Sequence, residues 1–252
     1  MTPFSLLIGL GAVLGLAWVA WQAPEKLALR RIDQGLWLLL GALLGGRLVH
    51  VAMAWSYYAG GLLEIPQVWL GGFSGVGALA GALLALALLA FITRQPLGEL
   101  ADAYLPLAAA LTVSAWLACW VDGCAYGVET TAWWSLPARD EWGELERRVP
   151  LQLLAASLTL GLFWLVDRSR TRLRRAGQPA CLVLLGLGLL NLGISFLRVD
   201  PSPTWAGWRP ETWAGFAFGL LAVAVYLLTL IPLQRSVSDL ASAETDFPHH
   251  TP

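Results

Sequence analysis

Long uninterrupted runs of apolar residues limit how this 252-residue chain can fold more than any other feature of its sequence. Several runs exceed the roughly 18 residues that mark a membrane span. In hydrocarbon every backbone N–H and C=O must be paired inside the segment, so runs of this composition should be helical. The sequence therefore predicts an all-α integral membrane protein of about seven transmembrane helices. We place them near residues 4–22, 35–55, 70–92, 103–121, 151–166, 179–197 and 212–232.

Composition agrees with this fold class and excludes others. Hydrophobic residues make up 57% of the chain and charged residues 13%, whereas soluble domains usually carry about 25% charged residues. The net charge of −1 provides no basic surface for nucleic acid. Residues 1–24 contain no Lys or Arg ahead of their apolar stretch, so we interpret them as the first span rather than a signal peptide.

Cysteine and histidine usage predicts neither a metal site nor a cofactor. Cys119, Cys124 and Cys181 are too few for a disulfide framework and lack zinc-finger spacing. The five-residue gap between Cys119 and Cys124 does not resemble a metal or redox pair, so we interpret both thiols as small hydrophobic side chains. The His249-His250 pair lies in the polar segment 236–252, which we expect to be a disordered tail and a poor metal site.

The distribution of Lys and Arg predicts the orientation in the membrane. With seven spans, ten basic residues fall on the side of the C-terminus: Lys26, Arg30, Arg31, Arg94, Arg168, Arg170, Arg172, Arg174, Arg175 and Arg235. Five fall on the opposite side, namely Arg139, Arg147, Arg148, Arg198 and Arg209, and Arg47 lies within a span. The richer side should be cytoplasmic, which places the N-terminus outside and the C-terminus in the cytoplasm.

This orientation defines the domain organisation. Residues 1–235 form a single transmembrane domain, and residues 128–150 form a small extracytoplasmic head between helices 4 and 5. The arginine-rich loop 168–175 is expected to contact anionic headgroups of membrane lipids in the inner leaflet.

Two polar residues in the second span do not belong in lipid. Arg47 follows Gly45-Gly46, and His50 lies three residues later on the same helix face. A charge at this depth normally faces a protein interior or an aqueous cavity and marks a functional site. The alternative is an arginine that extends to the outer interface or neutralises a structural acid.

Two further segments carry candidate site residues, each with a structural alternative. The glycine-rich segment 71–81 can let helices pack closely or can break a helix where its backbone faces a ligand. The end of helix 4, residues 119–127, concentrates an acid (Asp122), two thiols, a tyrosine and two glycines. Arg198 could bind an anionic headgroup or simply pair with Asp200.

Taken in order, six short motifs resemble one protein family. They are Gly45-Gly46-Arg47, Val68-Trp69-Leu70-Gly71-Gly72-Phe73-Ser74, Ala101-Asp102-Ala103-Tyr104-Leu105-Pro106, Gly123-Cys124-Ala125-Tyr126-Gly127, Pro150-Leu151-Gln152-Leu153 and Ser195-Phe196-Leu197-Arg198-Val199-Asp200. Their order and spacing are similar to those of the prolipoprotein diacylglyceryl transferase family of bacterial inner membranes. The resemblance covers residues 41–232.

The resemblance implies a reaction, a location and partners. The family transfers diacylglyceryl from phosphatidylglycerol to the cysteine thiol of a lipoprotein precursor, next to its signal segment, and releases glycerol phosphate. A multi-pass protein of the bacterial inner (cell) membrane is implied, with no cofactor and no metal. The phosphate needs cationic donors where charge develops, and the thiol attacks as thiolate, which calls for a base.

Matching positions then suggest roles for individual residues. Arg47, Arg198, Ser74 and Gly127 are expected to bind the phospholipid, and Asp122 or His50 is expected to take part in thiol deprotonation.

The chain also departs from the family pattern at positions where the family carries arginine or histidine. Trp116 and Asn191 stand in place of arginines, and Val76 stands in place of a histidine. An indole offers a single neutral donor and cannot replace a guanidinium. Two alternatives to a transferase therefore remain: a member of the same fold that binds lipid or a partner without catalysis, and a small-substrate transporter. The sequence contains no internal repeat or paired broken helices of the kind that transporters use.

Overall fold

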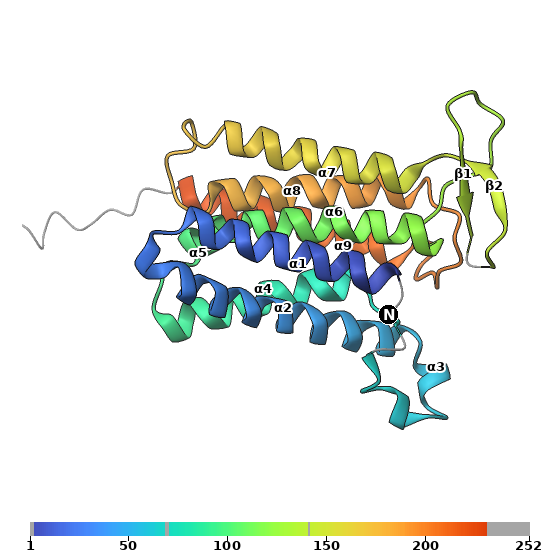
Figure 1. Ribbon diagram of the computed structural model, residues 1–252, viewed down its shortest axis with the longest axis horizontal. Helices are drawn as coiled ribbons and strands as arrows, with labels where there is room; N and C mark the ends of the chain where they lie inside the picture. The colour runs from blue at the N-terminus through green and yellow to red at the C-terminus, as the bar shows by residue number, and fades with distance from the viewer. Residues whose placement is uncertain (1–2, 69–70, 141, 231–252) are drawn as a thin grey trace, which may run out of the picture.

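The computed structural model describes residues 3–68, 71–140 and 142–230 and is mostly helical (Figure 1). By length and composition, seven helices among these residues can cross a membrane. They are α1 Pro3–Gln22, α2 Glu25–Met53, α4 Gly75–Thr93, α6 Leu105–Asp122, α7 Leu151–Arg168, α8 Gln178–Ser195 and α9 Pro210–Leu230. The predicted number of spans is confirmed, and the chain is a multi-pass membrane protein.

The boundaries differ from the prediction at three helices. Helix α2 begins at Glu25, ten residues before the predicted start at 35. The prediction assigns its first turns to a loop because they carry charged residues. Helix α4 begins at Gly75 rather than 70. The segment before α6 forms a separate short helix, α5 Leu97–Ala103. The end of the predicted span 212–232 and the predicted tail 236–252 lie outside the described residues.

Glycines bring α2 and α4 into backbone contact. A Cβ atom on Gly45 would lie 2.3 Å from the Gly77 carbonyl oxygen, and one on Gly81 would lie 2.1 Å from the Gly41 carbonyl oxygen. Without a hydrophobic driving force between helices in lipid, such close approach supplies the packing energy. The packing interpretation of the glycines within α4 is therefore confirmed. Helices α1 and α6, and α8 and α9, form the other closely packed pairs.

Asp102 connects α5 to the start of α8. Its carboxylate accepts hydrogen bonds from the backbone N–H groups of Gly177 (2.7 Å) and Ala180 (3.0 Å). These N–H groups belong to the first turn of α8, where intrahelical partners are missing. Burial raises the pKa of the Asp102 carboxyl, and the two hydrogen bonds oppose that shift. Asp102, which belongs to one of the motifs that resemble the family, thus has a structural role at the end of the bundle where α8 begins.

The head between α6 and α7 contains a hairpin that the all-α prediction missed. Strands β1 Leu136–Arg139 and β2 Leu145–Arg148 pair antiparallel and lie beyond the helix ends (Figure 1). Buried Arg148 forms ion pairs with Glu129 (2.9 Å) and Asp140 (3.5 Å) and lies 4.6 Å above the ring of Tyr126. Because four-residue strands rich in charge give little hydrophobic alternation, no strand pattern was visible.

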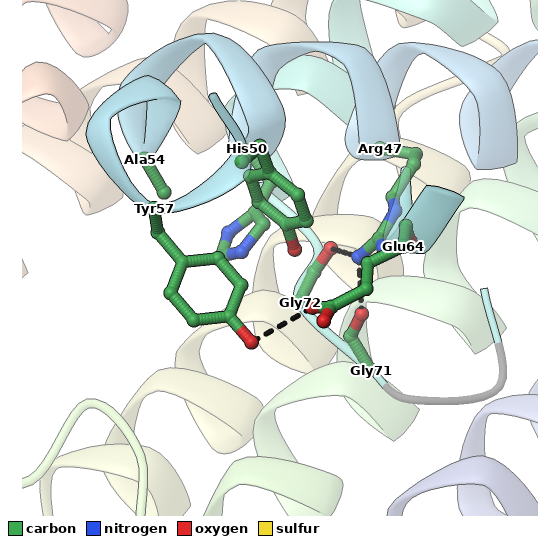
Figure 2. Close-up of a pocket in the computed structure, with 8 residues that line it drawn as sticks. Arg47, His50, Ala54, Tyr57, Glu64, Gly71 and Gly72 are labelled. Atoms are coloured by element: carbon green, nitrogen blue, oxygen red, sulfur yellow. Dashed lines mark hydrogen bonds between the residues drawn. The ribbon is translucent and has the colours of Figure 1, made fainter. Parts of the chain in front are cut away.

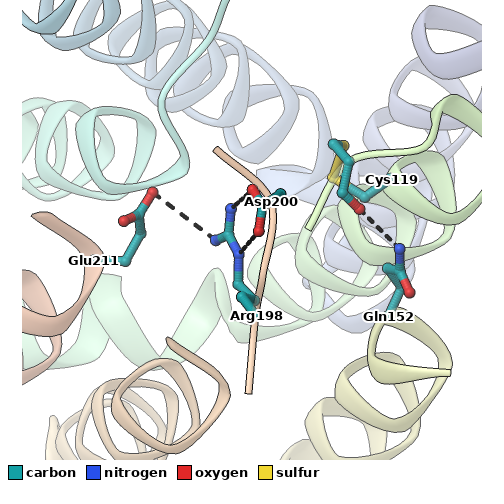
Figure 3. The surroundings of a disulfide bond; sticks show 6 residues. Cys119, Gln152, Arg198, Asp200 and Glu211 are labelled. Carbon is teal, nitrogen blue, oxygen red and sulfur yellow. Dashed lines mark hydrogen bonds and ion pairs between the residues drawn. A yellow bond between two sulfur atoms is a disulfide. The ribbon is translucent and has the colours of Figure 1, made fainter. Parts of the chain in front are cut away.

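A disulfide joins Cys119 to Cys124 where α6 ends (Figure 3). The interpretation of these two cysteines as unpaired hydrophobic side chains is therefore wrong. Residue Gly123, at φ 77°, reverses the chain between them and lets the two sulfurs meet. The carbonyl of Cys124 accepts a 2.8 Å hydrogen bond from Gln152, whose side chain is fully buried.

The segment that follows the disulfide pairs with the residues just after α8. Gly127 and Arg198 form an antiparallel β-bridge, and the Val199 N–H donates to the Tyr126 carbonyl at 3.1 Å. A Cβ on Gly127 would lie 2.8 Å from the Val149 carbonyl oxygen, so the segment has no room for a larger residue there. Backbone pairing thus fixes the position of Arg198 relative to the disulfide.

Candidate functional site

A cavity of about 270 Å³ lies where α2 ends. The chain leaves α2, forms the short helices α3 Trp55–Tyr58 and η1 Leu62–Glu64, and returns to α4 through Gly71 and Gly72. Figure 2 shows the residues that line the cavity: Arg47, His50, Ala54, Tyr57, Tyr58, Glu64, Gly71 and Gly72. The prediction that Arg47 and His50 share one helix face is confirmed, since both line this cavity.

Arg47 forms a clamp between α2 and the connection to α4. Its Nε donates to the carbonyl of Ile65 (2.9 Å), Nη1 donates to Gly71 (2.5 Å) and Gly72 (3.1 Å), and Nη2 donates to Glu64 (2.7 Å) and Gln67 (3.5 Å). A guanidinium has five N–H donors. Each therefore has a backbone acceptor in this structure, and none is left for a phosphate oxygen.

Although the carboxylate of Glu64 lines the same cavity, Arg47 forms no ion pair with any described residue. The residue is 5% exposed, and no carboxylate oxygen of a described residue lies within 4.0 Å of its nitrogens. Its guanidinium carbon lies 5.2 Å from the centroid of the Tyr58 ring, at a distance suited to a cation–π contact. The cavity wall therefore contains a buried cation that carbonyl dipoles and one aromatic ring stabilise.

Tyr57 and Glu64 also line the cavity. The Tyr57 hydroxyl donates to Glu64 Oε2 at 2.8 Å, as Figure 2 shows. This hydrogen bond, together with the charge of Glu64, raises the pKa of Tyr57, so the phenol keeps its proton. The rings of Tyr57 and Tyr58 meet edge to face at 5.0 Å between centroids, and Tyr58 meets His50 at 6.1 Å.

Gly72 is required where the returning chain passes under Arg47 and His50. Its φ of 76° is disfavoured for other residues, and a Cβ there would lie 2.6 Å from His50 Nε2 and 3.0 Å from Arg47 Nη1. The imidazole of His50 has no hydrogen-bond partner among the residues that the structure describes. Its ring nitrogens are thus available to a ligand in the cavity.

The other predicted phospholipid residue with a charge, Arg198, lies in an ion-pair cluster. It binds Asp200 through two nitrogens, at 2.9 Å and 2.5 Å, and its third nitrogen lies 3.8 Å from Glu211 (Figure 3). Arg209 also contacts Asp200, at 3.3 Å. Two cations and two carboxylates make this cluster electrically neutral.

The remaining predicted residues have separate positions. The Ser74 hydroxyl accepts from the Gly77 N–H at 3.3 Å and caps the start of α4. Asp122 is the last residue of α6 and is exposed. Gly127 lies beside Arg198 in the β-bridge. The structure therefore brings Arg47 together with His50, and Gly127 together with Arg198, but neither Asp122 nor Arg198 lines the cavity.

Sequence reasoning missed the two tyrosines and Glu64. Their only signal was a Tyr-Tyr pair and a single acid in the connection between two apolar runs. Within the described part of the chain, no group of three or more His, Cys, Asp or Glu residues is arranged to hold a metal ion.

Comparison with known proteins gives the family. A family model described as prolipoprotein diacylglyceryl transferase matches residues 1–229. Proteins named phosphatidylglycerol–prolipoprotein diacylglyceryl transferase are similar to this chain. One from Synechococcus elongatus is 30% identical over 222 residues, covering 78% of this chain and 73% of the relative. One from Bordetella parapertussis is 29% identical, covering 78% and 77%, and one from Streptococcus sanguinis is 28% identical, covering 74% of each.

These matches and the seven candidate spans define a multi-pass membrane protein. The chain belongs to the prolipoprotein diacylglyceryl transferase family.

Proposed function

We propose that this protein transfers diacylglyceryl from phosphatidylglycerol to the cysteine thiol of a lipoprotein precursor in the bacterial inner membrane. The observation that carries the proposal is the buried guanidinium of Arg47, which forms no ion pair with a described residue and lies in the wall of an open cavity at one end of the spans. The family's reaction requires a positive potential where the leaving phosphate develops negative charge, and the Arg47 guanidinium provides one.

Several features support an extracytoplasmic position for this end of the bundle. The end of α2, the end of α6 and the hairpin all lie at the same end (Figure 1). The Cys119–Cys124 disulfide is also there, and disulfides persist in oxidising compartments rather than in the cytoplasm. The loops at the opposite end are richer in Lys and Arg.

The proposed chemistry assigns roles to residues that line the cavity. The thiol proton passes to the free imidazole of His50, and the thiolate sulfur attacks the carbon of the diacylglyceryl moiety that is bonded to the phosphate. A C–S bond forms, the C–O bond to phosphate breaks, and glycerol phosphate leaves with its negative charge. Arg47 stabilises that charge through its field rather than by direct hydrogen bonds, because a buried charge acts over several ångströms in a medium of low dielectric constant. Arg198 is the second candidate for the phosphate, through the nitrogen that faces Glu211.

One observation favours a second candidate function, in which the protein binds lipid or a partner without transfer. All five N–H donors of Arg47 are taken by backbone carbonyls, and Asp200 occupies two nitrogens of Arg198. Trp116, Val76 and Asn191 add no cation. A protein that had lost the reaction would show these properties.

An in-membrane transfer assay distinguishes the two functions. Purified protein is mixed with phosphatidylglycerol liposomes and a peptide that carries a lipobox cysteine, and the thioether product is measured by mass spectrometry. We expect product with the wild type and a rate about 100-fold lower in His50→Gln, as for the loss of a general base. Glu99→Gln, an exposed position on α5, serves as the control and should retain the wild-type rate.

Absence of product from folded protein that retains bound lipid would establish the binding function instead. Product that forms equally well in His50→Gln would remove His50 from the mechanism while keeping the transfer.

A further inference from the structure

The groups that face the cavity are mainly hydrogen-bond acceptors. The donors of Arg47 are consumed by the carbonyls of the connection, including those of Gly71 and Gly72. Each carbonyl oxygen has a second lone pair. Glu64 Oε2 accepts from Tyr57, and within the described residues Oε1 has no donor. A ligand that brings hydrogen-bond donors therefore finds acceptors in this cavity, alongside the Tyr58 hydroxyl and the His50 imidazole, which can also donate.

The two charges of the cavity select against a charged ligand group. An ammonium placed beside Glu64 would also lie near the unpaired charge of Arg47. A phosphate placed inside the cavity would be repelled by the Glu64 carboxylate and would find no free N–H on Arg47. Like charges in a partly buried site repel each other more strongly than they do in bulk water. A neutral group with several hydroxyls avoids both penalties.

We propose that this cavity binds the terminal diol of a polyol phospholipid headgroup, with Glu64 as the hydroxyl acceptor that determines headgroup specificity. The proposal rests on the proposed function only in taking phosphatidylglycerol as the lipid. The phosphate then lies at the mouth of the cavity, within the field of Arg47, and the diol points toward Glu64. The three-carbon backbone of the headgroup contacts the ring of buried Tyr58.

Tyr57 acts on specificity through Glu64. Its hydroxyl holds one carboxylate oxygen at 2.8 Å, which directs the other oxygen to the ligand. The residue is largely exposed, so removal of its hydroxyl leaves the fold unchanged. Tyr57 is therefore a positioning residue, and its loss should weaken headgroup selectivity less than loss of the Glu64 charge.

A matched pair of lipids tests the proposal. Phosphatidylglycerol and phosphatidyl-n-propanol have the same charge and nearly the same size and differ by the two terminal hydroxyls. Binding of each lipid to the full-length protein in detergent is measured by native mass spectrometry, with competition between the two. We expect wild type to prefer phosphatidylglycerol about 10-fold, as one charge-assisted hydrogen bond provides.

The variants locate the source of that preference. Glu64→Gln should reduce it to about twofold, and Tyr57→Phe should reduce it to an intermediate value, because the carboxylate remains but is less well oriented. Glu99→Gln, whose exposed carboxylate lies on α5 away from the cavity, should keep the full preference.

Equal binding of the two lipids by wild type would overturn the proposal, even if thioether product forms in the transfer assay. A preference that survives in both Glu64→Gln and Tyr57→Phe would also overturn it. Selective binding without any transfer would support the headgroup site and contradict only the proposed reaction.

Discussion

At the scale of the residue, hydrogen-bond geometry and charge lead to different expectations for Arg47. A site that needs only a cation tolerates lysine, whereas a clamp needs the planar fork of five donors. The structure shows the fork satisfied by carbonyls of five different residues between 64 and 72. The connection between α2 and α4 therefore depends on arginine at this position.

Substitution of Arg47 by lysine should destabilise the protein by about 2 kcal/mol, and substitution by glutamine by about 3 kcal/mol, because buried carbonyls lose their donors. Both variants should also open residues 59–72 to limited proteolysis. Arg94→Lys, at an exposed position after α4, is the control and should change neither property. Wild-type stability and protease resistance in Arg47→Lys would show that charge alone is required there.

The sequence predicted the importance of Arg47 but not its partners. A charge inside an apolar run is visible in the sequence, and the cost of burying it indicates a role. Its acceptors are main-chain carbonyls 17 to 25 residues away, and every residue type carries such a carbonyl. The same reason explains why Glu64 was missed, since its role depends on how the connection folds back over α2.

At the scale of the element, the segment 119–127 joins three parts of the molecule. It ends α6, contacts the first turn of α7 through Gln152, and pairs with residues 198–199 after α8. The disulfide closes the turn that starts this segment. A closed turn restricts the unfolded chain more than an open one, which stabilises the folded state.

The double variant Cys119→Ser/Cys124→Ser should lose about 2 kcal/mol of stability, the value expected for a loop of about six residues. Denaturant unfolding of the wild type with and without reductant provides the comparison. Cys181→Ser, which removes the buried unpaired thiol and keeps the disulfide, is the control for the loss of a cysteine as such and should lose stability in reductant as the wild type does, whereas the double variant should not respond to reductant. Equal stability of double variant and wild type would mean that pairing with residues 198–199 is sufficient without the disulfide.

The helices that could be predicted from the sequence are those that form because of their hydrophobicity alone. The seven apolar runs became helices because no other structure satisfies the backbone in lipid. The hairpin and the disulfide were not predictable, because ion pairs of Arg148 and the turn at Gly123 hold residues 119–148 together without an apolar pattern. The early start of α2 was missed for a related reason, since Lys26, Arg30 and Arg31 extend that helix beyond its apolar part.

At the scale of the whole molecule, the two ends of the bundle differ in chemistry. The ends of α2 and α6 lie at the same end as the hairpin (Figure 1). This end therefore has the cavity, the disulfide and Arg198, which pairs with Gly127 just after the disulfide. The other end has the loop with five arginines between residues 168 and 175 and the Asp102 contact to the start of α8. This asymmetry predicts which end faces the cytoplasm.

Single cysteines at exposed threonines test the orientation. Thr131→Cys lies in the head, and Thr171→Cys lies in the arginine-rich loop. A membrane-impermeant maleimide should label Thr131→Cys in intact bacterial spheroplasts and Thr171→Cys only after permeabilisation. The native cysteines are paired or buried and keep the background low. The reverse labelling pattern would invert the orientation and place the cavity on the cytoplasmic side.

The contact between α2 and α4 also determines how a lipid can reach the cavity. Where two helix backbones touch through Gly41, Gly45, Gly77 and Gly81, no hydrocarbon chain has room to slip between them. The fatty-acid tails of a lipid that binds at the end of α2, as proposed above, must therefore lie beside this helix pair and not between its two helices. In the proposed reaction, the lipid-modified precursor can then leave sideways into the bilayer, and fresh lipid can replace it while the two helices remain in contact.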